Sequence, residues 1–143
     1  MGESRLLRPP FTLLYRFLYK LVEWTCGITL PYTTKVGRRV RIWHHSGMVL
    51  HARSIGDDVH VRHNTTFGVA RRGQNAEIPV IEDGVDLGCG VCVLGDVVVG
   101  RGSVIGASSV VLADVPPYSV AVGAPARVVK RLRADETTDG QNL

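Results

Sequence analysis

The sequence is poor in the residues that define several protein classes. Its 143 residues include only three cysteines, Cys26, Cys89 and Cys92, which cannot all pair within the chain. A disulfide framework is therefore not expected, and the thiols indicate a reducing compartment. The excess of 17 Lys and Arg over 13 Asp and Glu is too small to indicate nucleic-acid binding.

Strong helix formers are also in a minority. Valine supplies 22 residues against 13 leucines, and there are 16 glycines. This composition excludes a helical bundle and favours β-structure with many turns. A hydrophobic content of 45% is enough for a core, and a chain of this length corresponds to one domain.

Aliphatic residues recur at every sixth position along much of the chain. The unbroken series is Ile81, Leu87, Val93, Val99, Ile105 and Val111, and two shorter series are Val36, Ile42, Met48 and Ile55, Val61, Phe67. A period of six fits neither a helix, whose faces recur every three to four residues, nor an alternating strand. It predicts short strands joined by tight corners, with three faces closing each coil and roughly four coils stacked in parallel.

Glycines and breaks in the period add detail to this prediction. Glycine directly follows the aliphatic residue at positions 37, 56, 68, 88, 100 and 106. We expect glycine there because a missing Cβ permits the corner conformation. The period slips by one residue between Met48 and Ile55 and by two between Phe67 and Ile81, which predicts a loop at 70–79.

A different segment precedes the repeats. After two prolines, apolar residues fall on one stripe of a helix: Phe11, Leu14, Phe17, Leu18, Leu21 and Val22. This helix is too short and too charged to cross a bilayer. Two roles stay open, a cap over the open end of the coil stack or a membrane-surface helix with Arg5, Arg8, Arg16 and Lys20 near anionic headgroups. We therefore expect a helical segment at 1–26, a β-helix domain at 27–131 and a disordered tail at 132–143.

The histidines mark the candidate site. All five lie within one short stretch: His44, His45, His51, His60 and His63. Imidazole is the usual group that removes a proton from a hydroxyl near neutral pH, and zinc binding by histidines of two subunits is the alternative. The single Cys89-x-x-Cys92 pair lies inside the six-residue register, so we interpret both cysteines as packing residues.

The closing segment completes the pattern. It reads V-P-P-Y-S-V-A-V-G-A-P-A-R-V-V-K at 115–130, where two prolines end the coil and basic residues follow. Together, the six-residue repeats, the loop and this closing segment resemble the left-handed β-helix (hexapeptide-repeat) acyltransferases, in particular their serine O-acetyltransferase branch. The resemblance covers residues 27–131. The resemblance implies an all-β, left-handed parallel β-helix that forms homotrimers and binds acetyl-CoA as co-substrate, with no metal.

The resemblance also implies roles for individual residues. The family's catalytic histidine falls on His44 in the segment I-W-H-H-S-G, as general base, with His45 as the alternative. The pantetheine arm is expected along main-chain groups, and the nucleotide against two basic side chains. The cofactor-binding residues expected in this way are Phe67, Gly68, Cys89, Ala107, Arg127 and Lys130.

Departures from the resemblance bear on the acceptor. Positions that hold two aspartates and a histidine in serine acetyltransferases hold Thr29, Trp43 and Ile78 here, so the charged partners of an amino acid are missing. Trp43 instead offers a flat apolar face on which a sugar ring can pack, and we add His63 and Asn64 to the acceptor side.

The sequence therefore predicts an acetyl-CoA-dependent O-acetyltransferase acting on a sugar hydroxyl, in exopolysaccharide or surface-glycan biosynthesis. A serine O-acetyltransferase is one alternative, and a non-catalytic or metal-binding β-helix protein is the other. We expect a cytoplasmic protein that binds no nucleic acid, with the inner face of the membrane as a second location if the N-terminal helix makes peripheral contact.

Overall fold

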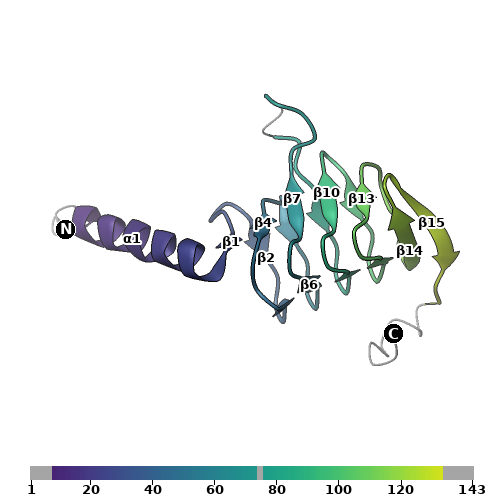
Figure 1. The fold of residues 1–143 in the computed structure, drawn as a ribbon, viewed down its shortest axis with the longest axis horizontal. Helices are drawn as coiled ribbons and strands as arrows, with labels where there is room; N and C mark the ends of the chain where they lie inside the picture. The colour runs from purple at the N-terminus through teal and green to yellow at the C-terminus, as the bar shows by residue number, and fades with distance from the viewer. Residues whose placement is uncertain (1–7, 74–75, 134–143) are drawn as a thin grey trace, which may run out of the picture.

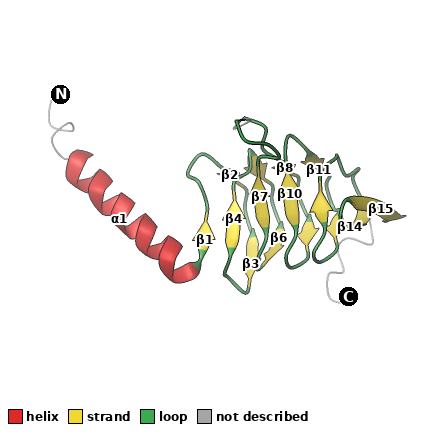
Figure 2. Cartoon of the chain, turned by 45° about the horizontal axis from the view of Figure 1, so that its top comes forward, coloured by secondary structure: helices red, strands yellow, loops and turns green. Residues whose placement is uncertain are grey.

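The chain folds into a parallel β-solenoid with one projecting helix. The structure is a computed structural model, which describes residues 8–73 and 76–133. Helix α1 (Arg8–Cys26) leads into a stack of coils that runs from β1 to β15, as Figures 1 and 2 show. The predicted tail lies outside the described residues from 134 onward.

Three sheets form the sides of the solenoid. Sheet A contains β1 (Ile28–Thr29), β4 (Met48–Leu50), β7 (Thr66–Gly68), β10 (Cys92–Leu94) and β13 (Val110–Val111). Sheet B contains β2 (Lys35–Val36), β5 (Ser54–Ile55), β8 (Val80–Ile81) and β11 (Val98–Val99). Sheet C contains β3 (Arg41–Trp43), β6 (His60–Arg62), β9 (Asp86–Leu87), β12 (Val104–Ile105), β14 (Ser119–Gly123) and β15 (Ala126–Arg131).

The six-residue period places the core. In sheet A, Val93 pairs with Phe67 on one side and with Val111 on the other, and all three are fully buried. The other members of the unbroken series are buried in the same core from the other two sides, Ile81 and Val99 from sheet B and Leu87 and Ile105 from sheet C. The parallel pairing of strands one coil apart on all three sides confirms the predicted coils.

The solenoid is longer than the hexads alone indicate. Sheet A has five strands where the period predicted roughly four coils, because β1 precedes the first six-residue repeat, and β14 likewise extends sheet C beyond the last repeat. The predicted loop lies between β7 and β8, and residues 74 and 75 within it are outside the described residues.

The reason for the glycines differs from the prediction. Gly88 does not adopt a positive φ; instead, a Cβ at this position would lie 2.5 Å from the backbone nitrogen of Ala107 in the next coil. A Cβ on Gly37, Gly56 or Gly100 would likewise lie 2.5 Å from an atom of a neighbouring coil. These glycines are therefore required by the close approach of successive coils. Gly68, beside the loop, differs, because a Cβ added there would meet no atom within 4 Å.

The two ends of the stack differ. At the C-terminal end, β14 and β15 form an antiparallel hairpin on sheet C. At the other end, Val36 and Ile42 remain 46% and 41% exposed, because α1 projects away from the coils (Figure 2). The interpretation of α1 as a cap over this end is thus wrong for the single chain. Among the described residues there is no helix long and apolar enough to cross a membrane.

Candidate functional site

One corner of the solenoid collects most of the predicted site residues. It joins sheet C to sheet A, and we call it the histidine corner, formed by residues 44–47, 63–65, 89–91 and 107–109 in four successive coils. His44 and His45 follow β3, and His63 and Asn64 follow β6. Cys89 and Ala107 occupy the corresponding turns of the next two coils. Successive turns lie about 4.8 Å apart, so the corner forms a continuous row along the solenoid.

Main-chain hydrogen bonds fix this row. The carbonyl of Ser46 accepts from the N–H of Asn64 at 3.0 Å, that of His63 accepts from Gly90 at 3.0 Å, and that of Cys89 accepts from Ser108 at 2.8 Å. Each turn has a left-handed residue at the stacked position, namely Gly47 with φ 61°, Asn64, Gly90 and Ser108, and the first turn has a second one, His44 with φ 54°. The left-handed conformation of His44 is therefore an additional feature of its own turn, in a conformation that glycine and asparagine adopt with least strain.

The two histidines of adjacent coils lie against each other. The rings of His44 and His63 meet edge to face with centroids 6.2 Å apart. His44 is exposed, whereas His63 is half-buried and its Nδ1 is buried without a hydrogen-bond partner among the described residues. Leaving a buried nitrogen without a hydrogen bond costs free energy. An exposed His44 imidazole beside it can accept a proton from a hydroxyl.

The side chain of Asn64 contacts the turn that carries the two histidines. A Cβ on Gly47 would lie 2.4 Å from Oδ1 of Asn64, so the side chain of Asn64 rests directly on the turn that carries His44 and His45. The ring of His45 is exposed like that of His44. The geometry therefore leaves both histidines accessible, and only His44 makes a ring contact with His63.

A polar face of sheet C adjoins the corner. Trp43 pairs in register with Arg62 on the neighbouring strand, and its ring meets that of His60 edge to face at 6.1 Å. Arg62 forms an ion pair with Asp86 and also donates to the carbonyl of Leu87 at 2.9 Å. Trp43 remains 44% exposed, so this face offers an aromatic surface directly beside His44.

The predicted cofactor-binding residues separate into three places. Cys89 and Ala107 lie on the histidine corner, two and three coils from His44, about 10 and 14 Å along the axis. The side chain of Phe67 is in the core, and Gly68 lies at the opposite edge of sheet A, where its carbonyl accepts from Gly95 at 2.8 Å.

The two predicted nucleotide-binding residues are further away. Arg127 and Lys130 are exposed on β15 at the C-terminal end of the stack. A ligand that reaches from His44 to these side chains must therefore run along the coils.

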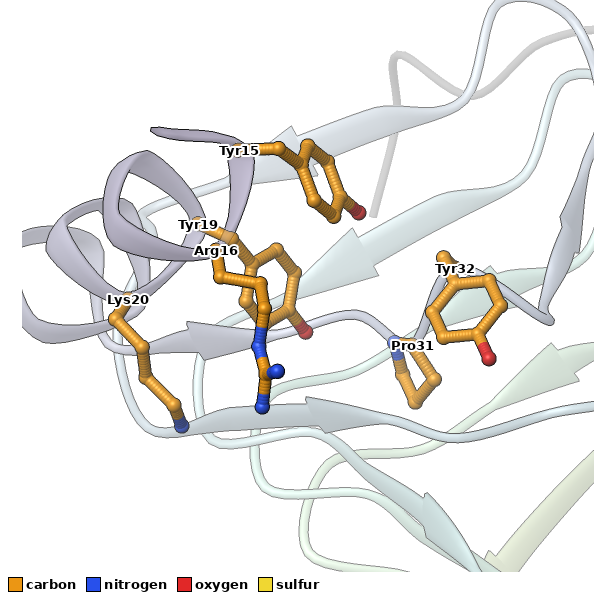
Figure 3. A pocket seen from close by; sticks show the side chains of 6 residues that line it. All are labelled: Tyr15, Arg16, Tyr19, Lys20, Pro31 and Tyr32. Atoms are coloured by element: carbon orange, nitrogen blue, oxygen red, sulfur yellow. The ribbon is translucent and has the colours of Figure 1, made fainter. Parts of the chain in front are cut away.

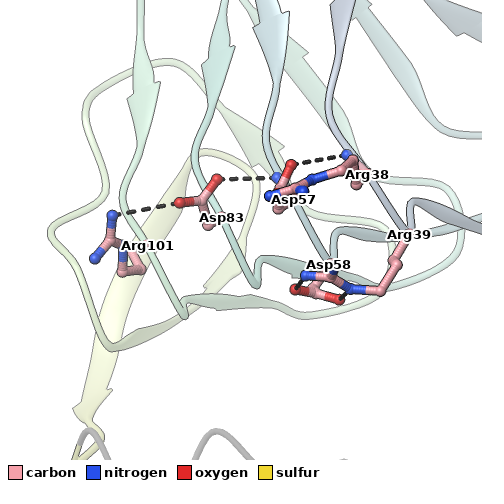
Figure 4. Close-up of polar contacts among 6 residues, drawn as sticks. All are labelled: Arg38, Arg39, Asp57, Asp58, Asp83 and Arg101. Atoms are coloured by element: carbon pink, nitrogen blue, oxygen red, sulfur yellow. Dashed lines mark hydrogen bonds and ion pairs between the residues drawn. The ribbon is translucent and has the colours of Figure 1, made fainter.

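The corner between sheets B and C carries a series of charged side chains that bond from coil to coil, which we call the ladder of charges: Arg38, Arg39, Asp57, Asp58 and Asp83. Oδ1 of Asp57 accepts from the N–H of Arg38 at 2.7 Å, and Oδ1 of Asp83 accepts from the N–H of Asp57 at 2.9 Å (Figure 4). Arg39 and Asp58 form a two-pronged ion pair at 2.6 and 2.7 Å. The N–H of Arg38 lowers the pKa of Asp57, and the guanidinium of Arg39 lowers the pKa of Asp58.

Neither the cysteines nor the acids form a metal site in the part of the chain that the structure describes. No group of three His, Cys, Asp or Glu side chains could hold an ion there. Cys26, Cys89 and Cys92 are all free and half-buried.

A pocket lies elsewhere, between α1 and the segment after β1. Tyr15, Arg16, Tyr19 and Lys20 of the helix line it together with Pro31 and Tyr32 (Figure 3). It contains no residue of the histidine corner, so we do not assign it to the predicted chemistry.

Sequence reasoning missed the partnerships between coils. The pairs His44 with His63, Arg39 with Asp58 and Arg38 with Asp57 are each separated by 19 residues in the sequence, one coil plus the single inserted residue. That spacing could have identified them, because residues one coil apart stack directly on one another in a solenoid.

The chain is similar to serine acetyltransferases. It is 36% identical over 121 residues to the serine acetyltransferase of Salmonella typhimurium, a match that covers 84% of this chain and 44% of that protein. It is 37% identical over 135 residues to that of Bacillus subtilis, with 91% and 62% covered. The chain thus spans about half the length of the curated relatives it matches.

Solved structures agree with the sequence matches. A structure described as serine acetyltransferase in complex with CoA superposes with a TM-score of 0.73 at 31% identity, covering 81% of this chain and 48% of that one. No protein-family model matches the sequence.

Proposed function

We propose that this chain, a homologue of the serine acetyltransferases with their β-solenoid fold, transfers an acetyl group from acetyl-CoA to a hydroxyl group. The observation that carries the proposal is the histidine corner, where the exposed imidazole of His44 lies at one end of a row that continues to Cys89 and Ala107. The relative solved with CoA supports a thioester co-substrate.

The chemistry requires few groups. His44 accepts the proton of the acceptor hydroxyl while the hydroxyl oxygen attacks the thioester carbonyl carbon. The C–S bond then breaks, and the protonated His44 returns its proton to the sulfur, so that CoA leaves as the free thiol. Main-chain N–H groups of the corner are suited to stabilise the developing oxyanion. Arg127 and Lys130 suit the phosphates of the nucleotide at the far end.

The comparison with relatives changes the acceptor that we propose. The sequence predicted a sugar, but the matched proteins are serine acetyltransferases, so we propose serine as the first acceptor to test. A sugar stays as the second candidate because of one observation, the exposed ring of Trp43 beside His44. An aromatic face binds a pyranose ring well and does little for a small zwitterion.

A thiol-release assay tests the activity and the acceptor together. The protein is mixed with acetyl-CoA and either serine or a panel of nucleotide sugars and glycosides, and free CoA is measured. Release that depends on serine supports the serine assignment, whereas release only with a sugar supports the second candidate. No acceptor-dependent release, together with no thermal shift on adding CoA, would contradict the proposal.

We further propose that the active form is a homotrimer in a reducing, cytoplasmic compartment, with residues 27–131 as the catalytic unit. Support for the compartment comes from the free thiols, and support for the assembly comes from the resemblance to the hexapeptide-repeat acyltransferases. Sedimentation velocity checks the assembly: a species of three times 15.6 kDa is expected, and a monomer would contradict it.

A further inference from the structure

Helix α1 exposes an unusually large apolar surface. Every member of the sequence stripe is exposed, and so are apolar side chains on both flanks of it; the exposed set is Phe11, Leu13, Leu14, Tyr15, Phe17, Leu18, Leu21, Val22 and Trp24. Contiguous exposed apolar patches of this kind mark surfaces that contact another protein or a membrane.

The helix turns its polar side toward its own solenoid. Tyr19 donates from its hydroxyl to the carbonyl of Leu30 at 3.0 Å, and Glu23 accepts from Thr29 at 2.8 Å. At 3.6 residues per turn, the centre of the stripe, near Leu14 and Leu21, lies about half a turn away from these two residues. The coils of the same chain therefore leave the stripe uncovered.

The charge of the chain is concentrated at the same end. Residues 1–53 contain nine Lys and Arg against two Asp and Glu, whereas residues 54–143 contain eight against eleven. Arg38, Arg39 and Arg53 pair with Asp57, Asp58 and Asp96 of later coils, so six Lys and Arg against two acids leave a charge of +4 on residues 1–53. Among residues 11–53 the only acid is Glu23, which is hydrogen-bonded to Thr29 and paired with Lys20. Arg16 and Lys20 lie together beside the tyrosines of the pocket (Figure 3).

We propose that α1 and the basic first coil bind the surface of an anionic bilayer, with the stripe inserted among the acyl chains and Arg16 and Lys20 at the headgroups. A wide apolar face with flanking aromatic and basic side chains is typical of helices that lie in the membrane interface. The proposal goes beyond acetyl transfer and does not depend on it.

A second copy of the chain explains the surface less well. A coiled-coil seam buries two of every seven residues, whereas the exposed apolar side chains of α1 cover more than half of its circumference. Association through this end would also bring together segments that each keep a positive charge after the ion pairs of Arg38, Arg39 and Arg53 are counted. An anionic surface satisfies both the apolar face and the charge.

Vesicle co-sedimentation of the full chain tests the proposal. We expect binding to vesicles of phosphatidylcholine and phosphatidylglycerol in equal parts, loss of binding at high salt, and little binding to phosphatidylcholine alone. The variant F17E/L21E changes two exposed stripe residues, so it should fold normally and bind these vesicles at least about tenfold more weakly. The control Val129→Glu adds a charge at an exposed valine of β15 and should bind like the unmodified protein.

Sedimentation velocity on the same samples excludes the alternative. F17E/L21E should keep the assembly state and the thermal stability of the unmodified protein. If the unmodified protein binds neither vesicle, or if F17E/L21E dissociates the assembly, the proposal is wrong, and in the second case a copy of the chain covers the stripe. Thiol release measured without vesicles reports on the acetyl transfer separately.

Discussion

Among single residues, His44 combines an exposed imidazole with a left-handed backbone, and this affects how its role is tested. Alanine would remove the base and also strain the turn, whereas asparagine tolerates a left-handed backbone, as Asn64 shows in the next coil. We therefore expect His44→Asn to keep the fold and the affinity for CoA but to lower turnover by about 10²–10⁴, the usual contribution of a general base. Thiol release and thermal shift measure the two properties.

His45→Ala is the matched control in the same turn. It should retain most of the activity, since His45 is the exposed neighbour without the contact to His63. Full activity in His44→Asn together with a loss in His45→Ala would transfer the role of general base to His45.

A substitution of Trp43 tests the acceptor side of the site. Because its exposed ring lies beside His44 on the outer face of sheet C, Trp43→Ala should raise KM for a sugar acceptor by about tenfold, and it should leave KM for serine and for acetyl-CoA unchanged. Steady-state kinetics with each substrate varied in turn measure these constants. A rise confined to the KM for acetyl-CoA would place the ring on the thioester side instead.

For the elements, the spacing of the coils makes a prediction about stability. A methyl group at Gly88 would lie 2.5 Å from a backbone nitrogen of the next coil, which cannot move independently of its own strand. We expect Gly88→Ala to lower the free energy of unfolding by about 1–3 kcal/mol. Gly68→Ala, with open space around it, should change it by less than about 0.5 kcal/mol. Chemical denaturation measures both, and equal effects would contradict the packing argument.

The same elements show what the sequence can and cannot predict. Burial at Leu87, Val93 and Val99 follows from the six-residue period, since one side of each short strand must face the core. The period also located the loop before β8. It could not supply the reason for Gly88, because the approach of the next coil depends on the distance between turns and not on the local backbone.

The candidate site was only partly accessible from the sequence. The clustering of histidines indicated the corner, but the contact of His44 with His63 depends on the register between the two coils. The period predicted an inserted residue after Met48, whereas Trp43 pairs with Arg62 and Leu50 with Phe67, so the extra residues lie in the turn after Trp43. The direction of α1 was not predictable either. A helical stripe indicates that one face is to be buried and does not identify what buries it.

For the whole molecule, the ladder of charges predicts a response to acid. Asp57 and Asp58 have pKa values below the ordinary 3.8, because an N–H bond from Arg38 and a guanidinium of Arg39 favour their charged forms. Carboxylates with lowered pKa values contribute stability that is present above the unfolded pKa and is lost as pH falls through the folded one. We expect the Tm to be steady above about pH 5 and to fall below about pH 4.

The variant Asp58→Asn isolates this contribution. It removes the two-pronged pair with Arg39, so its Tm should be lower than that of the unmodified protein at neutral pH, and the difference should shrink in acid. Scanning calorimetry over pH 3–7 measures it. A difference that stays constant across this range would mean that the pair does not contribute through its charge.

The loop between β7 and β8 has a consequence for how such a protein can diversify. Elsewhere, at Gly37, Gly56, Gly88 and Gly100, neighbouring turns leave no room for one added carbon atom, so an insertion there must shift a whole turn. Beside Gly68 the chain departs from the stack into open space. New segments can be grafted at this opening without altering the register of the coils, which makes it the natural place for lineages of this fold to vary in length and for engineers to add a peptide.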